Sequence, residues 1–224
     1  MSKTRTKSAT RAENEQIILA AAENVFAEFG FKGATTGMIA ERAGLPKANL
    51  HYYFSTKLAL YRQVVENIFQ TWLQAADTFD DCDDPREALT RYIGAKMDIS
   101  REHPMGSKVW ANEILQKAPV IQDYLETTLI DWTNTRIAVI ERWVAEGKMA
   151  PVDPRNLLYM IWSTTQHYAD FHHQIETLND GKPLNDQQFE IAKQTVINVI
   201  LAGVGITPTL GSISTDKSQD REMA

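Results

Sequence analysis

Side chains that can contact a nucleic acid are concentrated in residues 35–57, around a short segment that begins after Pro46. As a helix, this segment fits a major groove with its N-terminal residues towards base edges. Hydroxyl groups and an ammonium group on either side of it suit contacts to phosphate. The candidate contacts to double-stranded operator DNA are Thr35, Thr36, Lys47, Ala48, Asn49, His51, Tyr52, Tyr53 and Lys57.

A second pair of residues could bind a small molecule. Trp162 and Gln166 are four residues apart, so they share one face of a helix. An indole is a flat apolar wall, and a carboxamide offers both a donor and an acceptor, which together complement a flat ring with an adjacent carbonyl and N–H. Spacing alone favours another interpretation, in which Trp72, Trp110 and Trp162 fill the core and Gln166 is satisfied inside a dimer.

Two further groupings could suggest a metal site or a hydrolase. His167, Asp170, His172 and His173 contain no HExxH arrangement, and adjacent histidines on a helix point in different directions. Ser163, His167 and Asp170 lie in no Gly-x-Ser-x-Gly elbow, and no glycine-rich loop is present in the sequence. We therefore expect no enzyme activity, no metal and no cofactor.

The charge of the chain is unevenly distributed. Residues 1–60 contain eight basic and five acidic residues, a net charge of +3, whereas the whole chain has −6 and the remainder therefore −9. A basic end on an acidic body is typical of a protein that binds a polyanion at one end. The basic N-terminus precedes no apolar segment, and no apolar run is long enough for a membrane span, so we expect a cytoplasmic protein. The single Cys82 cannot form an intrachain disulfide.

Apolar residues recur at helical spacing along almost the whole chain, and no segment alternates as a strand would. Proline, glycine and capping residues divide this pattern into helices. Ser55 is the expected N-cap of the fourth helix, and Asp84-Pro85 and Asp153-Pro154 are expected cap-plus-proline starts. The expected helices are Asn14–Phe29, Thr36–Ala43, Pro46–Tyr53, Lys57–Thr78, Arg86–Arg101, Ser107–Leu115, Pro119–Glu146, Pro154–Leu178 and Asp186–Ile200.

The second and third of these helices form a helix-turn-helix, with a tight turn at Gly44. Ile39, Ala40 and Ala43 are expected to be the buried residues of the first helix. Leu45 and Leu50 are expected to be buried at the junction and in the second helix. The motifs around it are Phe29-Gly30-Phe31, Gly33-Ala34-Thr35-Thr36, Ile39-Ala40, Ala43-Gly44, Leu50-His51-Tyr52-Tyr53-Phe54 and Lys57. This signature resembles that of TetR-type repressors over about 50 residues. Many members carry Glu at the position of Leu58, where it would complete a capping box with Ser55.

The remainder of the chain resembles the pyrimidine-utilisation regulators of the same family, most clearly over residues 160–171. Trp72, Trp162 and Gln166 match positions that line the ligand pocket of those regulators, which leave DNA when uracil or thymine binds. Lys96, Ser107, Trp110 and Glu113 fall in segments near that pocket. Trp110 stands where an otherwise similar protein has Phe, which implies a different pocket size.

The expected fold is all-α. A three-helix DNA-binding head comprises residues 1–55, with a basic flexible arm at 1–12, and a ligand-binding and dimerisation body comprises residues 56–205. Residues 206–224 are expected to be a mobile tail. The resemblance implies a homodimer, paired through helices near 154–178 and 186–203, that a planar polar effector releases from DNA. The alternatives are a TetR-type repressor with a different effector and a ligand-binding protein that does not bind DNA.

Overall fold

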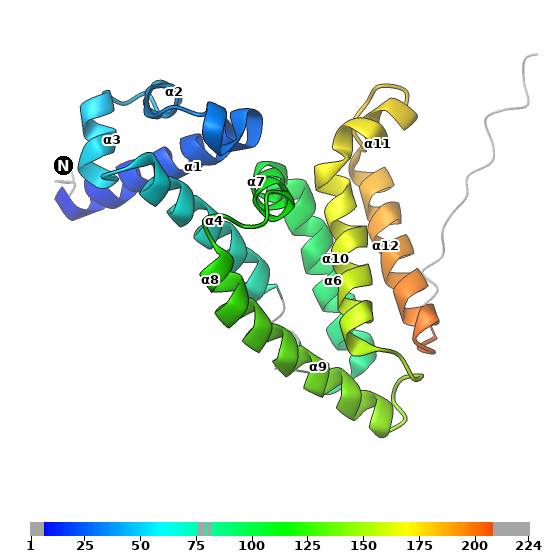
Figure 1. Ribbon diagram of the computed structural model, residues 1–224. Helices are drawn as coiled ribbons and strands as arrows, with labels where there is room; N and C mark the ends of the chain where they lie inside the picture. The colour runs from blue at the N-terminus through cyan, green and yellow to red at the C-terminus, as the bar shows by residue number, and fades with distance from the viewer. Residues whose placement is uncertain (1–6, 76–78, 80–81, 208–224) are drawn as a thin grey trace, which may run out of the picture.

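A computed structural model describes residues 7–75, 79 and 82–207, and all of the regular structure in them is helical (Figure 1). Within these residues the fold class agrees with the prediction. Predictions for residues 1–6, 76–78 and 80–81 and for the tail after residue 207 lie outside the described part. Residues 7–12, predicted as part of a flexible arm, are helical and belong to α1. The helices are α1 (Lys7–Gly33), α2 (Thr36–Arg42), α3 (Lys47–Tyr53), α4 (Lys57–Gln74), α6 (Pro85–Glu102), α7 (Pro104–Leu115), α8 (Gln122–Tyr124), the π-helical segment η1 (Leu125–Leu129), α9 (Ile130–Ala145), α10 (Pro154–Asp170), α11 (His172–Leu178) and α12 (Asp186–Gly203).

Helix α1 begins at Lys7, seven residues before the predicted Asn14, whereas the turns that follow it lie where the sequence predicts. Gly30 interrupts α1 with φ 64°, and Gly44 turns the chain between α2 and α3 with φ 65°, backbone angles that glycine adopts without steric cost. The Thr35 side chain accepts a hydrogen bond from the Met38 N–H and caps α2. Pro46 differs from the prediction because it occupies the N-cap position of α3 rather than its first turn.

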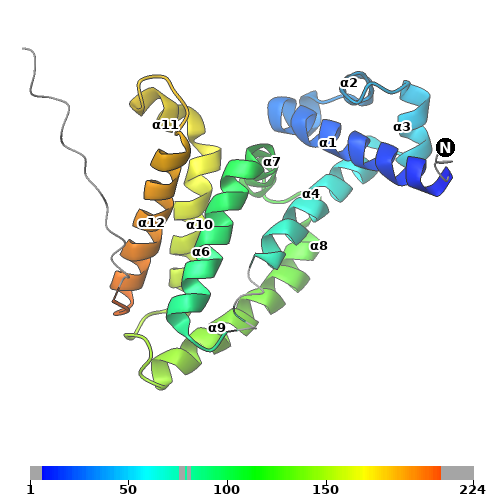
Figure 2. The same ribbon diagram turned by 180° about the vertical axis from the view of Figure 1, so that it is seen from behind.

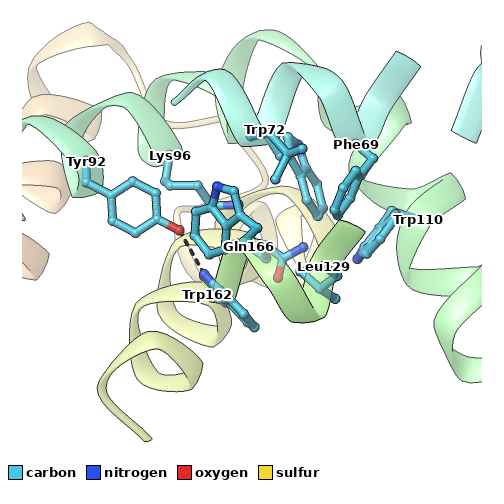
Figure 3. Close-up of a pocket in the computed structure, with 10 residues that line it drawn as sticks. Phe69, Trp72, Tyr92, Lys96, Trp110, Leu129, Trp162 and Gln166 are labelled. Atoms are coloured by element: carbon cyan, nitrogen blue, oxygen red, sulfur yellow. Dashed lines mark hydrogen bonds between the residues drawn. The ribbon is translucent and has the colours of Figure 1, made fainter. Parts of the chain in front are cut away.

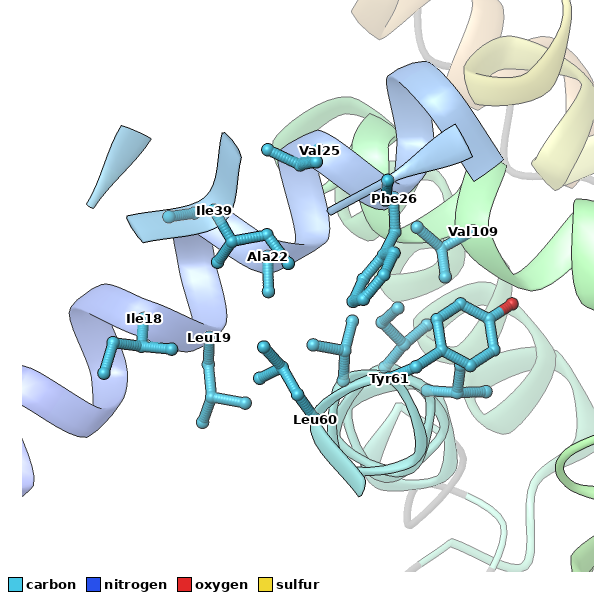
Figure 4. Close-up of a cluster of buried hydrophobic side chains, with 14 of the residues drawn as sticks. Ile18, Leu19, Ala22, Val25, Phe26, Ile39, Leu60, Tyr61 and Val109 are labelled. Carbon is cyan, nitrogen blue, oxygen red and sulfur yellow. The ribbon is translucent and has the colours of Figure 1, made fainter. Parts of the chain in front are cut away.

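One hydrophobic cluster joins these helices to α4 and α7 (Figure 4). Ile18 and Val25 of α1, Ile39 of α2 and Leu60 of α4 are fully or almost fully buried in it. The N-cap of α4 is Thr56 rather than the predicted Ser55, because the Thr56 hydroxyl accepts the Ala59 N–H at 3.0 Å. This shift places Ala59, rather than Leu58, at the third helical position of α4.

The body has two sides that meet around α7. α4 and the α8–α9 run lie on one side, and α6, α10 and α12 pack together on the other (Figure 2). A second hydrophobic cluster joins α6, α9, α10 and α12, with Trp143 and Ile161 completely buried. No helix in the described residues is long and apolar enough to cross a membrane.

Three body helices differ from their predicted bounds. α7 already begins at Pro104 rather than at Ser107. The helix predicted from Pro119 begins at Gln122, because Lys117 and Ala118 adopt positive φ and the chain turns before it enters α8. The helix predicted for 154–178 is broken at Phe171 into α10 and α11.

The predicted caps of α6 and α10 are confirmed, and Asn185 caps α12 at its predicted start. Asp84 accepts the Arg86 N–H, and Asp153 accepts the Asn156 N–H. Asn185 and Gln188 form a reciprocal capping box at the start of α12. These caps depend only on residues within one helical turn of each other.

Candidate DNA-binding face and ligand cavity

Helix α3 presents most of the candidate DNA contacts at one end of the molecule (Figure 1). Its Leu50 is completely buried and anchors the helix on α1 and α2. Five other residues of α3 are exposed, and the side chain of Tyr52 is 68% exposed. These exposed candidates are Lys47, Ala48, Asn49, His51 and Tyr52.

The candidates that flank α3 are partly engaged in local contacts. The Thr35 hydroxyl caps α2, Thr36 is half-buried, and the Tyr53 hydroxyl accepts a 3.3 Å hydrogen bond from the Asn14 side chain. The guanidinium of Arg11 lies 5.6 Å from the centre of the Tyr52 ring, which places a further cation beside α3. Arg11 is not among the predicted contacts, although it lies in the basic N-terminal segment.

The ammonium of Lys57 points into the protein. It donates hydrogen bonds to the backbone carbonyls of Phe31, at 2.7 Å, and Ala34, at 2.9 Å, and it lies 4.5 Å from the centre of the Phe31 ring. Lys57 therefore joins the first turn of α4 to the chain that follows Gly30. Two of its three donors are used in this way, so a phosphate contact stays a prediction that only the third can satisfy.

A cavity of about 60 Å³ lies between the two sides of the body (Figure 3). Six helical segments bring its walls together, and five of the seven predicted ligand residues line it. Phe69 and Trp110 stack with their ring centres 5.3 Å apart, and Trp72 meets Trp110 edge-on at the same distance. The lining residues are Phe69, Trp72, Leu73, Tyr92, Lys96, Trp110, Leu129, Trp132, Trp162 and Gln166.

The polar groups of the cavity come mainly from α6 and α10. The Trp162 indole donates a 2.8 Å hydrogen bond to the Tyr92 hydroxyl. Lys96 is only 4% exposed, and its ammonium lies 4.1 Å from the centre of the Trp72 ring. Burial lowers the pKa of Lys96 to about 7, although the nearby Asp170 acts in the opposite direction. Lys96 and Gln166 point into the same space (Figure 3).

The other two predicted ligand residues do not line this cavity. The Ser107 hydroxyl donates to the Asp170 carboxylate at 2.5 Å. Glu113 accepts hydrogen bonds from the Tyr61 hydroxyl and from the Val120 N–H, and it faces a different groove, between α1 and α7.

Five lining residues were not selected from the sequence: Phe69, Leu73, Tyr92, Leu129 and Trp132. A signal for them existed in the helical spacing. Tyr92 lies four residues before Lys96, and Phe69 lies three before Trp72, so each shares a helix face with a predicted ligand residue.

The residues that resembled a hydrolase triad have separate partners. Ser163 donates to the Met160 carbonyl, His167 stacks on Phe171, and Asp170 accepts from Ser107. Among the residues that the structure describes, no group of three His, Cys, Asp or Glu side chains could hold a metal ion.

Two family descriptions match the sequence. Residues 18–64 match "Bacterial regulatory proteins, tetR family", and residues 65–207 match "YcdC-like protein, C-terminal region". Among curated proteins, the chain is 42% identical over 185 residues to the HTH-type transcriptional regulator RutR of Escherichia coli strain K12, covering 83% of this chain and 86% of that protein.

Solved structures of low sequence identity share the fold. The ketosteroid transcriptional regulator KstR2 of Mycobacterium tuberculosis has a TM-score of 0.65 at 22% identity and covers 89% of this chain and 97% of its own. FadR of Bacillus subtilis, in complex with stearoyl-CoA, has a TM-score of 0.62 at 18% identity and covers 84% of this chain and 98% of its own. Both relatives are transcriptional regulators, which are not enzymes.

Proposed function

The chain belongs to the TetR family of bacterial transcriptional regulators, and from this premise we propose that it is a dimeric repressor released from operator DNA by a pyrimidine-like ring. The single observation that carries the effector assignment is the meeting of Trp72, Trp162 and Gln166 around one cavity. Gln166 offers a donor and an acceptor side by side, and the indoles supply flat walls, as a ring with an adjacent carbonyl and N–H requires.

The proposed DNA contacts are made by the exposed residues of α3, together with the flanking hydroxyl groups. A helix presented at one end of a compact support is the arrangement by which helix-turn-helix proteins enter the major groove. A two-fold axis would present two copies of α3 to successive half-sites. Because operator DNA is the target, the protein would act in the cytoplasm.

The homodimer would form through the outer faces of α10 and α12. Large apolar side chains remain exposed on these faces of the single chain, and Met160 and Val199 are 58% and 64% exposed. Tyr159, Phe171 and Ile191 add to the same surfaces. A large apolar surface of this kind marks a protein–protein interface.

Release from DNA would follow from the small size of the cavity. Its volume is about 60 Å³, whereas a dry protein cavity that accommodates benzene has about 150 Å³. A six-membered ring would therefore have to displace walls such as Trp72 and Leu129. Trp72 is on α4, whose N-terminal half packs against α1 in the cluster that supports the head. Movement of α4 would change the spacing of the two copies of α3.

A gel shift combined with calorimetric titration tests this proposal. We expect salt-dependent binding of the dimer to DNA from its own promoter region, and release by uracil or thymine but not by a bicyclic purine. If only another compound releases the DNA, the repressor function stands and the pyrimidine effector is wrong. Absence of DNA binding at low salt, in a protein that still binds the ring, would identify a ligand-binding protein without DNA binding.

A further inference from the structure

We infer that the effector is an anionic planar ring, and that Lys96 binds its negatively charged edge. The inference rests on the proposed function, because it takes the aromatic cavity as the effector site. It adds the charge of the ligand, which the flat walls and Gln166 leave undetermined.

The first observation is that the ammonium of Lys96 has no partner that neutralises it. Lys96 is 4% exposed and lines the cavity. Within residues 7–75, 79 and 82–207, its Nζ makes only the contact with the face of Trp72, at 4.1 Å, and no ion pair or hydrogen bond. Glu113, another buried charged residue, has two hydrogen bonds. A buried cation normally has an anionic partner, and an anionic ligand would supply one.

The second observation is that donors outnumber acceptors in the cavity wall. The indole Nε1 of Trp132 is buried and has no hydrogen-bond partner in the described part of the chain. The Tyr92 hydroxyl already accepts a hydrogen bond from Trp162, and its own proton is still available to donate one. Lys96 adds further donors. The Gln166 carbonyl is the one lining side-chain group here that can only accept, so the wall complements a ligand rich in acceptors.

The third observation is the charge around the cavity. The guanidinium of Arg136, which is only 6% exposed, lies 5.1 Å from the centre of the Trp132 ring. Asp170 is the opposing carboxylate near Lys96, but it accepts the Ser107 hydroxyl at 2.5 Å and forms no ion pair with Lys96. Burial also raises the pKa of Asp170. Lys96 therefore has a carboxylate nearby but no ion pair with it.

The size of the cavity limits how the ligand can be charged. Because the cavity of about 60 Å³ must widen even for a single six-membered ring, a ring without a long acidic substituent requires the least displacement of its walls. The ligand class that fits is a single ring whose own N–H or hydroxyl is acidic, so that the charge is delocalised over ring oxygens and nitrogens. A neutral pyrimidine would satisfy Gln166 and leave the charge of Lys96 unmatched.

Uracil and barbiturate form a matched pair of probes. Both are six-membered pyrimidine rings, but barbiturate has one more oxygen and is an anion at neutral pH. We expect the full-length wild-type protein to bind barbiturate about 10- to 100-fold more tightly than uracil in calorimetric titration, because hydrogen bonds to charged groups are stronger than neutral ones. We expect Lys96→Met to remove this preference and Lys96→Arg to retain part of it. Lys182→Met, at an exposed loop lysine, is the matched control and should change neither affinity.

The outcomes separate the inference from the proposed function. If wild-type protein binds both rings equally, or uracil more tightly, and both release operator DNA, the proposed function stands and the anionic effector is wrong. The same holds if Lys96→Met, with a helical circular dichroism spectrum like that of wild type, keeps the preference for barbiturate. If neither ring binds wild-type protein or releases DNA, the pyrimidine function fails, and with it the inference that rests on it.

Discussion

The DNA-binding face and the ligand cavity place their candidate residues in opposite ways. In α3 one residue, Leu50, is buried, and five neighbours in the same short helix are exposed. Around the cavity the lining residues are buried or half-buried, and α4, α6, α7, η1, α9 and α10 each contribute only one to three of them. The first site depends on spacing within one helix, whereas the second depends on how distant helices pack. Changes at the DNA-binding face should affect DNA binding alone, and changes at the cavity should affect ligand binding alone.

The largest expected effect breaks the dimer and removes specific DNA binding although α3 is unchanged. Val199 is 64% exposed on α12, and Val199→Glu should place a charge in the proposed interface. We expect a monomer by sedimentation and at least about 100-fold weaker operator binding, because two half-sites supply the affinity together. This variant is preferable to deletion of α12, which would also remove the buried Phe189 and Ile200 from the core.

Gln166→Leu should separate the two sites most cleanly. Leucine keeps similar bulk, but a ring amide left unpaired costs about 1–3 kcal/mol, or about 5- to 150-fold in effector affinity. Operator binding without ligand should stay near that of wild type. Asn49→Ala, on the exposed face of α3, is the matched opposite variant and should weaken operator binding without changing ligand affinity. Unchanged ligand affinity in Gln166→Leu would show that this residue does not contact the ligand. Loss of operator binding would show that it stabilises the dimer.

Lys57→Met tests the junction between the two regions. The ammonium bonds to two backbone carbonyls, so its loss should lower the free energy of unfolding by about 1.5–3 kcal/mol in urea titration. A direct phosphate contact would instead lower the salt slope of DNA binding by about one per subunit, with little change in stability. Unchanged stability together with a reduced slope would show that the inward position does not describe the DNA-bound protein.

The smallest effect concerns the pH dependence of stability. Burial lowers the pKa of Lys96 from 10.5 to about 7 in the folded state. Between these values the unfolded chain binds more protons, so this residue makes stability rise with pH and gives its full penalty below pH 7. Lys96→Met should therefore be more stable than wild type near pH 6, and the difference should shrink towards pH 10. Urea unfolding at fixed protomer concentration measures this, and a difference independent of pH would contradict it.

The helix-turn-helix was predictable because its determinants are local. Gly30 and Gly44 take the left-handed backbone angles that their positions require, and Thr35 caps the helix that begins beside it. The caps at Asp84, Asp153 and Asn185 are equally local. Each of these features is set by residues within about one helical turn, where sequence spacing and spatial distance are nearly the same.

Longer-range features could not be predicted in this way. The α8–α9 run begins at Gln122 rather than at Pro119, because the preceding residues turn and Ile121 is buried in the core. Trp132 and Tyr92 line the cavity through packing between elements far apart in the sequence. Lys57 looked like an exposed phosphate contact, but the backbone carbonyls that it binds lie 23 and 26 residues away.

The amino-acid sequence by itself therefore determined the fold class, most of the helix starts and the exposed face of α3. The tertiary structure decided which buried polar groups share the cavity. It brought Lys96, Trp132 and Gln166 around one space. It gave Ser107 a hydrogen bond to Asp170 and Glu113 a hydrogen bond from Tyr61, both away from that space. The physical reason is that helix starts and helix faces follow from the period of the chain, whereas the partner of a buried polar group depends on which helix packs against it.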